Sequence, residues 1–121
     1  MPSVDIEIVL RPGEVPPPNL ARRLADGIGK VFGSPPGTTW VKLHFLPREQ
    51  YAENAVSLPD DLAPVFVSIL KAQSGDAAAL QHEIAQLTPL IASLTARSAQ
   101  NVHILYQPAG SGRIAFGGSL R

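Results

Sequence analysis

The sequence predicts an α+β fold in two layers, in which two helices cover one face of a four-stranded sheet. Two observations support this prediction. Segments with an apolar residue at every second position alternate with segments whose apolar residues recur at helical spacing, and the order strand, helix, strand occurs twice. A connection that contains a helix allows a parallel crossover, and such crossovers are right-handed, so both helices should lie on the same face of the sheet.

The first unit begins with a strand at residues 4–10, whose apolar and acidic side chains alternate between two faces. A proline-rich connection then ends at Asn19, a residue type favoured at helix N-caps. Apolar residues at helical spacing predict a helix over 20–31, and the glycines and prolines of 33–37 end it. Residues 39–46 alternate again and form the second predicted strand.

The second unit repeats this order. An apolar strand follows Pro64, a helix begins near Asp76, and residues 102–106 form the fourth strand. Pro89 removes one backbone donor inside the second helix and should kink or divide it. Corresponding strand residues such as Ile8 and Ile69 are 61 positions apart. Duplication explains this offset, with chance similarity of short strands as the alternative, and predicts one domain over 1–121 made of two repeats at about 2–56 and 62–119.

Composition excludes several classes of function. Ten basic residues balance ten acidic ones without any run of Lys or Arg, so the surface expected of a general nucleic-acid binder is missing. The absence of cysteine excludes disulfides, thiolate metal sites and a cysteine nucleophile, and the three histidines lack zinc-ligand spacing. We therefore expect no metal or cofactor. The opening strand and the lack of a long apolar stretch indicate a cytoplasmic protein with no membrane partner.

The two ends of the chain carry a combined pattern. The chain starts Met1-Pro2 and enters a strand at once, and it ends with a strand at 101–106, a glycine-containing loop at 110–113 and Ile114-Ala115-Phe116-Gly117-Gly118. These segments resemble the opening and closing segments of the 4-oxalocrotonate tautomerase family, and Trp40-Val41-Lys42-Leu43 closes the first unit similarly. The fused form is similar to macrophage migration inhibitory factor, 5-carboxymethyl-2-hydroxymuconate isomerase and the cis-3-chloroacrylic acid dehalogenases. This resemblance implies a homotrimer with a free N-terminal proline near a subunit boundary.

The resemblance implies that Pro2 is the catalytic acid–base group. An α-amino group has a pKa of about 8, and burial or a nearby cation lowers it, which leaves a neutral base near pH 7. Pro2 has this chemistry only where Met1 has been removed, since its nitrogen is otherwise an amide. The alternative is a proline that merely starts a strand. Pro64 is the counterpart in the second unit, and because its nitrogen lies within a peptide bond, it is structural.

Substrates of this family are small keto or enol carboxylic acids, which require cations and a donor for the enolate oxygen. The resemblance places Arg11 at a carboxylate-binding position and Lys42 at a second one, where lysine replaces arginine and would bind as a point charge. His103 is the second-unit equivalent of Lys42, and Tyr106 and Arg113 flank the terminal loop. Each residue also has an ordinary interpretation, as a solvated surface charge or as a packed side chain with a satisfied polar tip.

Two further segments limit the chemistry. Lys71 ends the third strand where the dehalogenases carry arginines, which disfavours chloroacrylate dehalogenation. The loop Gly110-Ser111-Gly112 lacks the spacing and the Lys-Ser/Thr ending of a phosphate-binding P-loop, so we interpret it as the bend of a hairpin.

Three functions remain open at this point. The first is an isomerase that moves a proton on a small keto or enol carboxylic acid, with Pro2 as the acid–base group. The second is a hydratase or dehalogenase that acts on an unsaturated acid in the same pocket. The third is a non-catalytic oligomer that retains Met1 and binds a small ligand or a partner through its sheet.

Overall fold

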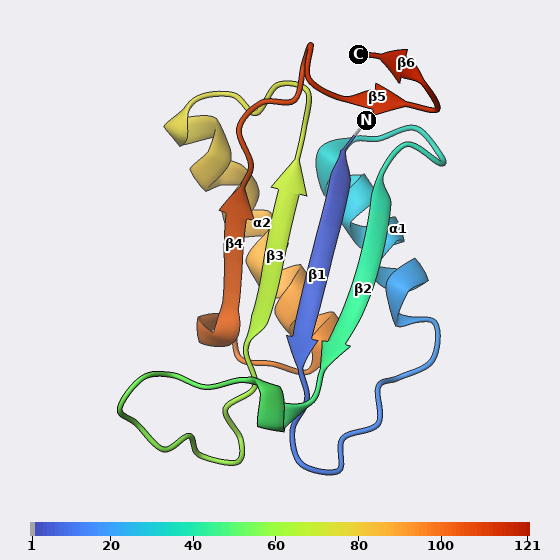
Figure 1. Ribbon diagram of the computed structural model, residues 1–121. Helices are drawn as coiled ribbons and strands as arrows, with labels where there is room; N and C mark the ends of the chain where they lie inside the picture. The colour runs from blue at the N-terminus through green and yellow to red at the C-terminus, as the bar shows by residue number, and fades with distance from the viewer. Residues whose placement is uncertain (1) are drawn as a thin grey trace.

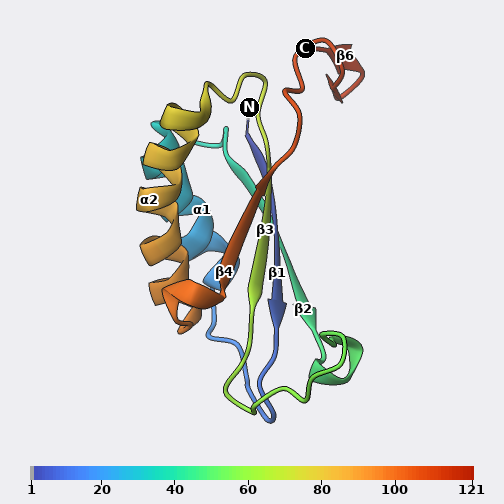
Figure 2. The same cartoon turned by 90° about the vertical axis from the view of Figure 1, so that its left-hand side faces the viewer.

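A four-stranded sheet and two helices form the two layers of the computed structural model, which describes residues 2–121 (Figure 1). Both helices lie on one face of the sheet and the other face is open (Figure 2), which confirms the predicted α+β class. In residues 2–121, neither helix combines the length and apolar character needed to cross a membrane. The elements are β1 (Ser3–Val9), α1 (Leu20–Phe32), β2 (Trp40–Leu46), η1 (Arg48–Gln50), β3 (Val65–Leu70), α2 (Ala77–Thr95), η2 (Ala99–Asn101), β4 (Val102–Tyr106), β5 (Ala115–Phe116) and β6 (Ser119–Leu120).

The sheet has the strand order β2-β1-β3-β4 and is built from two parallel pairs joined by one antiparallel pair. Ser3 faces Trp40 in β2, and Val65 faces Val102 in β4, so the partner lies 37 positions further along the chain in both parallel pairs. At the centre, Ile6 of β1 faces Val67 of β3, and these two residues are 61 positions apart. The strands therefore follow a local twofold axis that passes between β1 and β3.

The core lies between the sheet and the helices. Alternate residues of β1 and β3 point towards the helices, and leucines and isoleucines of α1 and α2 cover them. Fully removing one such side chain from water contributes about 1.5–3 kcal/mol. The main buried residues of this layer are Val4, Ile6, Ile8, Val65, Val67, Ile69, Leu24, Ile28, Leu87 and Ile91.

The helix ends differ in part from the prediction. Gly33 ends α1 in the left-handed conformation, as predicted, and the Asp76 side chain caps α2 by accepting a hydrogen bond from Ala79 N–H at 2.9 Å. Asn19 occupies the N-cap position of α1, but among residues 2–121 its side chain makes no capping hydrogen bond, because its backbone is left-handed with φ 59°. Pro89 lies inside α2 without dividing it.

The C-terminal hairpin bends later than predicted. Gly110 accepts a hydrogen bond from Arg113 N–H at 2.8 Å, which makes this glycine-containing loop a tight turn before the hairpin. The bend between β5 and β6 lies at Gly117 and Gly118, which have φ angles of 59° and 87°. Two successive positive φ angles favour glycine, so this pair fixes the bend.

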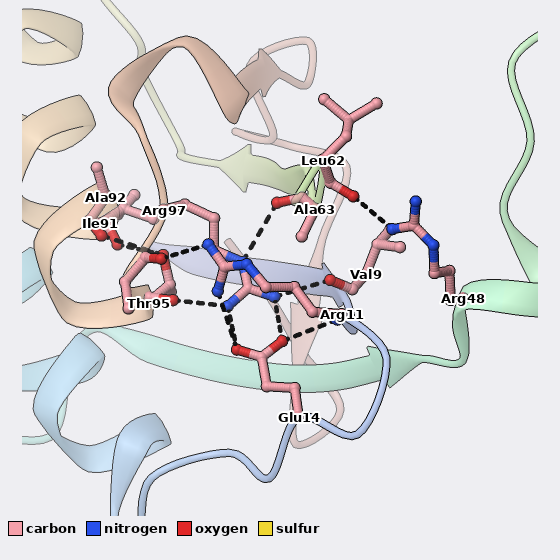
Figure 3. Close-up of polar contacts among 11 residues, drawn as sticks. Val9, Arg11, Glu14, Arg48, Leu62, Ala63, Ile91, Ala92, Thr95 and Arg97 are labelled. Carbon is pink, nitrogen blue, oxygen red and sulfur yellow. Dashed lines mark hydrogen bonds and ion pairs between the residues drawn. The ribbon is translucent and has the colours of Figure 1, made fainter. Parts of the chain in front are cut away.

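A buried arginine joins four segments at the end of the sheet that lies far from the N-terminus (Figure 3). The Arg97 guanidinium donates to the carbonyls of Val9 at 2.8 Å, Ala63 at 3.2 Å and Thr95 at 2.7 Å. It also binds both carboxylate oxygens of Glu14, at 2.5 and 2.6 Å. Arg97 therefore ties the end of β1, the approach to β3, the end of α2 and the connection before α1 to one another.

Glu14 lies between two arginines. Its carboxylate accepts hydrogen bonds from the backbone N–H of Arg11 at 3.0 Å and from the Arg11 side chain at 3.3 Å, in addition to those from Arg97. The hydrogen bond from Arg97 is the main cause that holds the pKa of Glu14 below its ordinary value of 4.5, against the opposing effect of burial. The charged form of Glu14 is therefore favoured in the folded protein.

Glu14→Gln should lower the free energy of unfolding at pH 7 by about 3 kcal/mol, because it leaves the buried Arg97 cation without its anion. A carboxyl with a depressed folded-state pKa stabilises the fold above its unfolded pKa, and this contribution disappears as the pH falls through the folded pKa. The difference between the two proteins should therefore shrink below about pH 4.5. Urea unfolding across this pH range measures it, with the exposed Glu49→Gln as control. Equal stability of wild type and Glu14→Gln at pH 7 would contradict the assignment.

Candidate functional site

Pro2 lies at the end of the sheet where β1 begins. Its carbonyl accepts a hydrogen bond from Trp40 N–H at 3.0 Å, which extends the β1–β2 pairing by one residue. Ser3 faces Leu70 across the antiparallel pair, so Lys71 is the next residue opposite Pro2. Because successive side chains of a strand point to opposite faces, Pro2 and Lys71 both lie on the helix side of the sheet.

An open depression of about 400 Å³ lies around Pro2. The sheet supplies Pro2 and Lys71, while the end of α1 and the connection after it supply the opposite wall. Lys71 is the charged residue among the described residues that line this depression. The full lining is Pro2, Phe32, Gly33, Ser34, Pro35, Thr38 and Lys71.

A chain of polar contacts holds Lys71 in place. Its ammonium lies 4.3 Å from the ring centroid of Phe32 and 2.8 Å from Oε2 of Glu83, which comes from α2. The other carboxylate oxygen of Glu83 accepts a hydrogen bond from the Tyr106 hydroxyl at 2.7 Å. The Lys71 and Glu83 side chains are only 18% and 17% exposed, so their attraction is screened far less than that of a surface pair.

Tyr106 stays protonated at physiological pH. Burial is the main cause that raises the pKa of Tyr106, and its hydrogen bond to Glu83 and the negative charge of that carboxylate raise it further. The hydroxyl is therefore a donor to Glu83. Tyr106 is thus connected to the Pro2 depression through Glu83 and Lys71.

Arg11 lies at the other end of β1 from Pro2. The seven residues of β1 span about 23 Å, so the two residues do not share a site within one chain. The Arg11 guanidinium binds Glu14 at 3.3 Å and the carbonyl of Ala96 at 2.7 Å. These contacts give Arg11 a structural role in the chain itself.

The remaining predicted binding residues also lie away from the depression. Lys42 is on the open face of the sheet, where its ammonium is 3.2 Å from the Asp5 carboxylate and both side chains are well exposed. His103 lies on the same face with its ring 5.4 Å from that of Phe66. Arg113 is exposed in the turn before the hairpin. Within one chain, Tyr106 is thus the predicted binding residue that connects to the depression around Pro2.

The open face of the sheet carries a groove of about 390 Å³ and several exposed apolar side chains. Phe66 is 37% exposed and Leu105 62% exposed, and charged or polar residues such as Glu7 and His44 lie beside them. The hairpin and the β2–β3 connection both project on this side of the sheet (Figure 2). Arg48 fixes that connection by donating to backbone carbonyls, those of Leu58, Pro59 and Leu62.

The hairpin packs beside the N-terminal end of the sheet (Figure 1). The ring of Phe116 in β5 meets Trp40 of β2 edge to face, with centroids 5.1 Å apart and an interplanar angle of 87°. Phe116 also lines a smaller cavity of about 230 Å³, together with Ala72, Gly110, Ser111, Ile114 and Arg121. Across residues 2–121, no three His, Asp or Glu side chains lie close enough together to hold a metal ion.

No family model matches the sequence, and no curated protein matches it either. Similar solved structures do exist. The F6 fused 4-OT, an asymmetric trimer, matches with a TM-score of 0.74 at 18% identity and covers 96% of this chain and 94% of its own. The macrophage migration inhibitory factor of Trichinella spiralis matches at 0.73 with 10% identity, and the shares covered are 97% and 97%. The FG41 malonate semialdehyde decarboxylase matches at 0.70 with 13% identity, over 94% and 88%.

The chain has the tautomerase fold. All three structures belong to the tautomerase superfamily, and the likeness extends over nearly the whole of both chains in each case. The resemblance predicted from the two ends of the sequence is therefore confirmed for the fold. With sequence identities of only 10–18%, the likeness to these structures shows the fold alone.

Phe116→Ala should release the hairpin from the sheet. Removing the aromatic partner of Trp40 costs about 1 kcal/mol beyond the lost apolar burial, and it further exposes the Trp40 side chain, which is 41% exposed in the folded chain. Trp40 is the single tryptophan of the chain, so its fluorescence emission should shift to longer wavelength while the far-ultraviolet circular dichroism stays unchanged. Leu120→Ala, at an exposed hairpin position, is the control. An unchanged emission maximum in Phe116→Ala would rule out this docking in solution.

Proposed function

We propose that this protein is a cofactor-independent isomerase that moves a proton between carbon and oxygen on a small keto or enol carboxylic acid. One observation supports this above all: Pro2 lies opposite Lys71 across the β1–β3 pair, in the same depression. The tautomerase fold adds to it. Met1 lies outside the described residues, and its removal in the cytoplasm would convert the Pro2 nitrogen into a free secondary amine.

The roles in this proposal follow from charge and position. Lys71 binds the substrate carboxylate and holds the reacting carbon near Pro2. The neutral Pro2 amine takes a proton from the carbon next to the carbonyl. The carbon–hydrogen electron pair forms a carbon–carbon double bond, and the π pair of the carbonyl moves to its oxygen, which gives an enolate. The Pro2 ammonium then returns the proton to the oxygen, so the amine is regenerated and no co-reactant is used. The reverse sequence converts the enol to the ketone.

We also propose that the protein assembles as a homotrimer through the open face of its sheet. The apolar side chains Phe66 and Leu105 on that face and the trimeric form of the fused 4-OT support this. Arg11 and Lys42 do not reach the Pro2 depression of their own chain, so in this proposal they contribute to it from a neighbouring subunit, as do His103 and Arg113.

The equal offsets within both parallel strand pairs support the proposal that the domain consists of two repeats, at about 2–56 and 62–119. Under this proposal each chain has one catalytic amine. The 61-residue offset places Ala63 at the position of Pro2, one residue earlier than Pro64, and the nitrogen of either residue lies within a peptide bond.

Pro2→Ala should lower kcat/KM for phenylenolpyruvate ketonisation by about 100-fold or more, because a primary amine with different basicity replaces the positioned proline. Alanine also permits removal of Met1, so intact mass can confirm that both proteins start at residue 2. Pro47→Ala, at an exposed position at the other end of the sheet, is the control and should keep its activity. A Pro2→Ala protein as active as wild type would exclude the proposed catalytic role, and turnover of a haloacrylate instead of the enol would favour the hydratase alternative.

Leu105→Lys should dissociate the proposed trimer, because a charge placed on the open face cannot be buried without a partner. Light scattering coupled to gel filtration should give three times the 12.8 kDa chain mass for wild type and a lower mass for the variant. Val15→Lys is the control, since Val15 is 85% exposed on the connection to the helix layer. A wild-type mass equal to one chain would disprove the assembly.

A further inference from the structure

Glu83 is an acidic residue on the inner side of α2 and both of its carboxylate oxygens are occupied. Oε2 lies 2.8 Å from the Lys71 ammonium, and Oε1 accepts the Tyr106 hydroxyl at 2.7 Å. The side chain is 17% exposed. Burial of a carboxylate is costly unless it is paired and hydrogen-bonded, and here a cation and a donor satisfy both conditions.

Lys71 lines the depression around Pro2 and Glu83 is paired with it, so the charges of both should act on the proline nitrogen. A cation near an amine disfavours the protonated form, whereas an anion favours it. Lys71 alone would therefore make Pro2 a weaker base than it is beside the Lys71–Glu83 pair. Four elements supply groups around Lys71. Pro2 at the start of β1 shares its depression, the uncharged Phe32 of α1 and Glu83 of α2 contact its ammonium, and Tyr106 of β4 binds Glu83.

We propose that Glu83 is a positioning residue of the Pro2 site, which fixes the Lys71 ammonium over Phe32 and offsets its charge at the proline nitrogen. Glu83 acts through Lys71, because its own oxygens are occupied by Lys71 and Tyr106. Tyr106 supports this role by holding the second oxygen, which keeps the carboxylate from rotating away from Lys71. The inference rests on the proposed function in one respect, because that function names Pro2 as the acid–base group whose pKa Glu83 would influence.

Two substitutions should move the titration of Pro2 in opposite directions. Glu83→Gln keeps a hydrogen-bond acceptor for Tyr106 but removes the negative charge, so the pKa of the Pro2 amine should fall by about one unit. Lys71→Gln removes the positive charge, so this pKa should rise by a similar amount. In kcat/KM against pH, the acid limb should move to lower pH in the first variant and to higher pH in the second.

Nitrogen-15 NMR of proline-labelled protein follows the Pro2 titration directly, after intact mass has confirmed the loss of Met1. Glu49→Gln removes the same charge at the opposite end of the sheet and should leave the titration unchanged. Glu83→Asp keeps the charge but shortens the side chain, so it should largely restore the wild-type titration while KM rises through the displaced Lys71. A Glu83→Gln protein whose Pro2 titrates at or above the wild-type pH would overturn the inference.

A second comparison covers the case in which Glu83→Gln does not fold. The double variant Lys71→Gln, Glu83→Gln leaves no unpaired buried charge, and its Pro2 should titrate at lower pH than in Lys71→Gln alone. Identical titrations in these two proteins would equally overturn the inference. The NMR readout requires no turnover, so inactive proteins whose Pro2 titrations shift as expected would refute the proposed function and leave the role of Glu83 intact.

Discussion

The buried ion pair between Arg97 and Glu14 fixes the geometry on which the Pro2 site depends. Arg97 holds the carbonyls of Val9 and Ala63, which lie just beyond the last pair of the antiparallel β1–β3 ladder, Ile8 and Val65. A slip of one residue in this pairing would move every side chain of one strand to the other face of the sheet. Lys71 would then leave the helix side and lose both Phe32 and Glu83. Arg97 stabilises the β1–β3 register at one end of the sheet. This register therefore determines that Lys71 lies opposite Pro2 at the other end.

The main strands and both helices could be predicted from the sequence because local signals specify them. Alternation defined the strands, Gly33 and Asp76 marked helix ends, and both were found where predicted. The binding residues could not be predicted in the same way, since their partners depend on register and on the crossover. Lys42 is paired with Asp5 only because β1 and β2 align these two residues. Arg11 is held by Glu14, three positions away, a pairing compatible with the sequence but established by the fold of the connection.

Glu83 shows what a sequence signal can and cannot supply. It lies between Leu80 and Leu87 in the apolar stripe of α2, where an acidic residue requires a buried partner. That requirement is visible in the sequence, but the identity of the cation is not. Lys71 precedes the connection to α2 and lies 12 positions before Glu83, so only the crossover that packs α2 against the end of β3 brings the two together.

The local twofold axis gives the sheet two related ends that have taken different roles. Around Pro2 the end is open, with a depression of about 400 Å³ and the Lys71–Glu83 pair beside it. The related end, beside Ala63, has a cavity of only about 10 Å³, because prolines of the connection, Phe45 and the Arg97–Glu14 pair fill it. An ion pair is present at both ends, but one is enclosed and stabilises the fold while the other lies beside the open depression around Pro2. Asymmetric filling of two related ends thus leaves one end open around the proposed site, while the other end fixes the register that places Lys71 opposite Pro2.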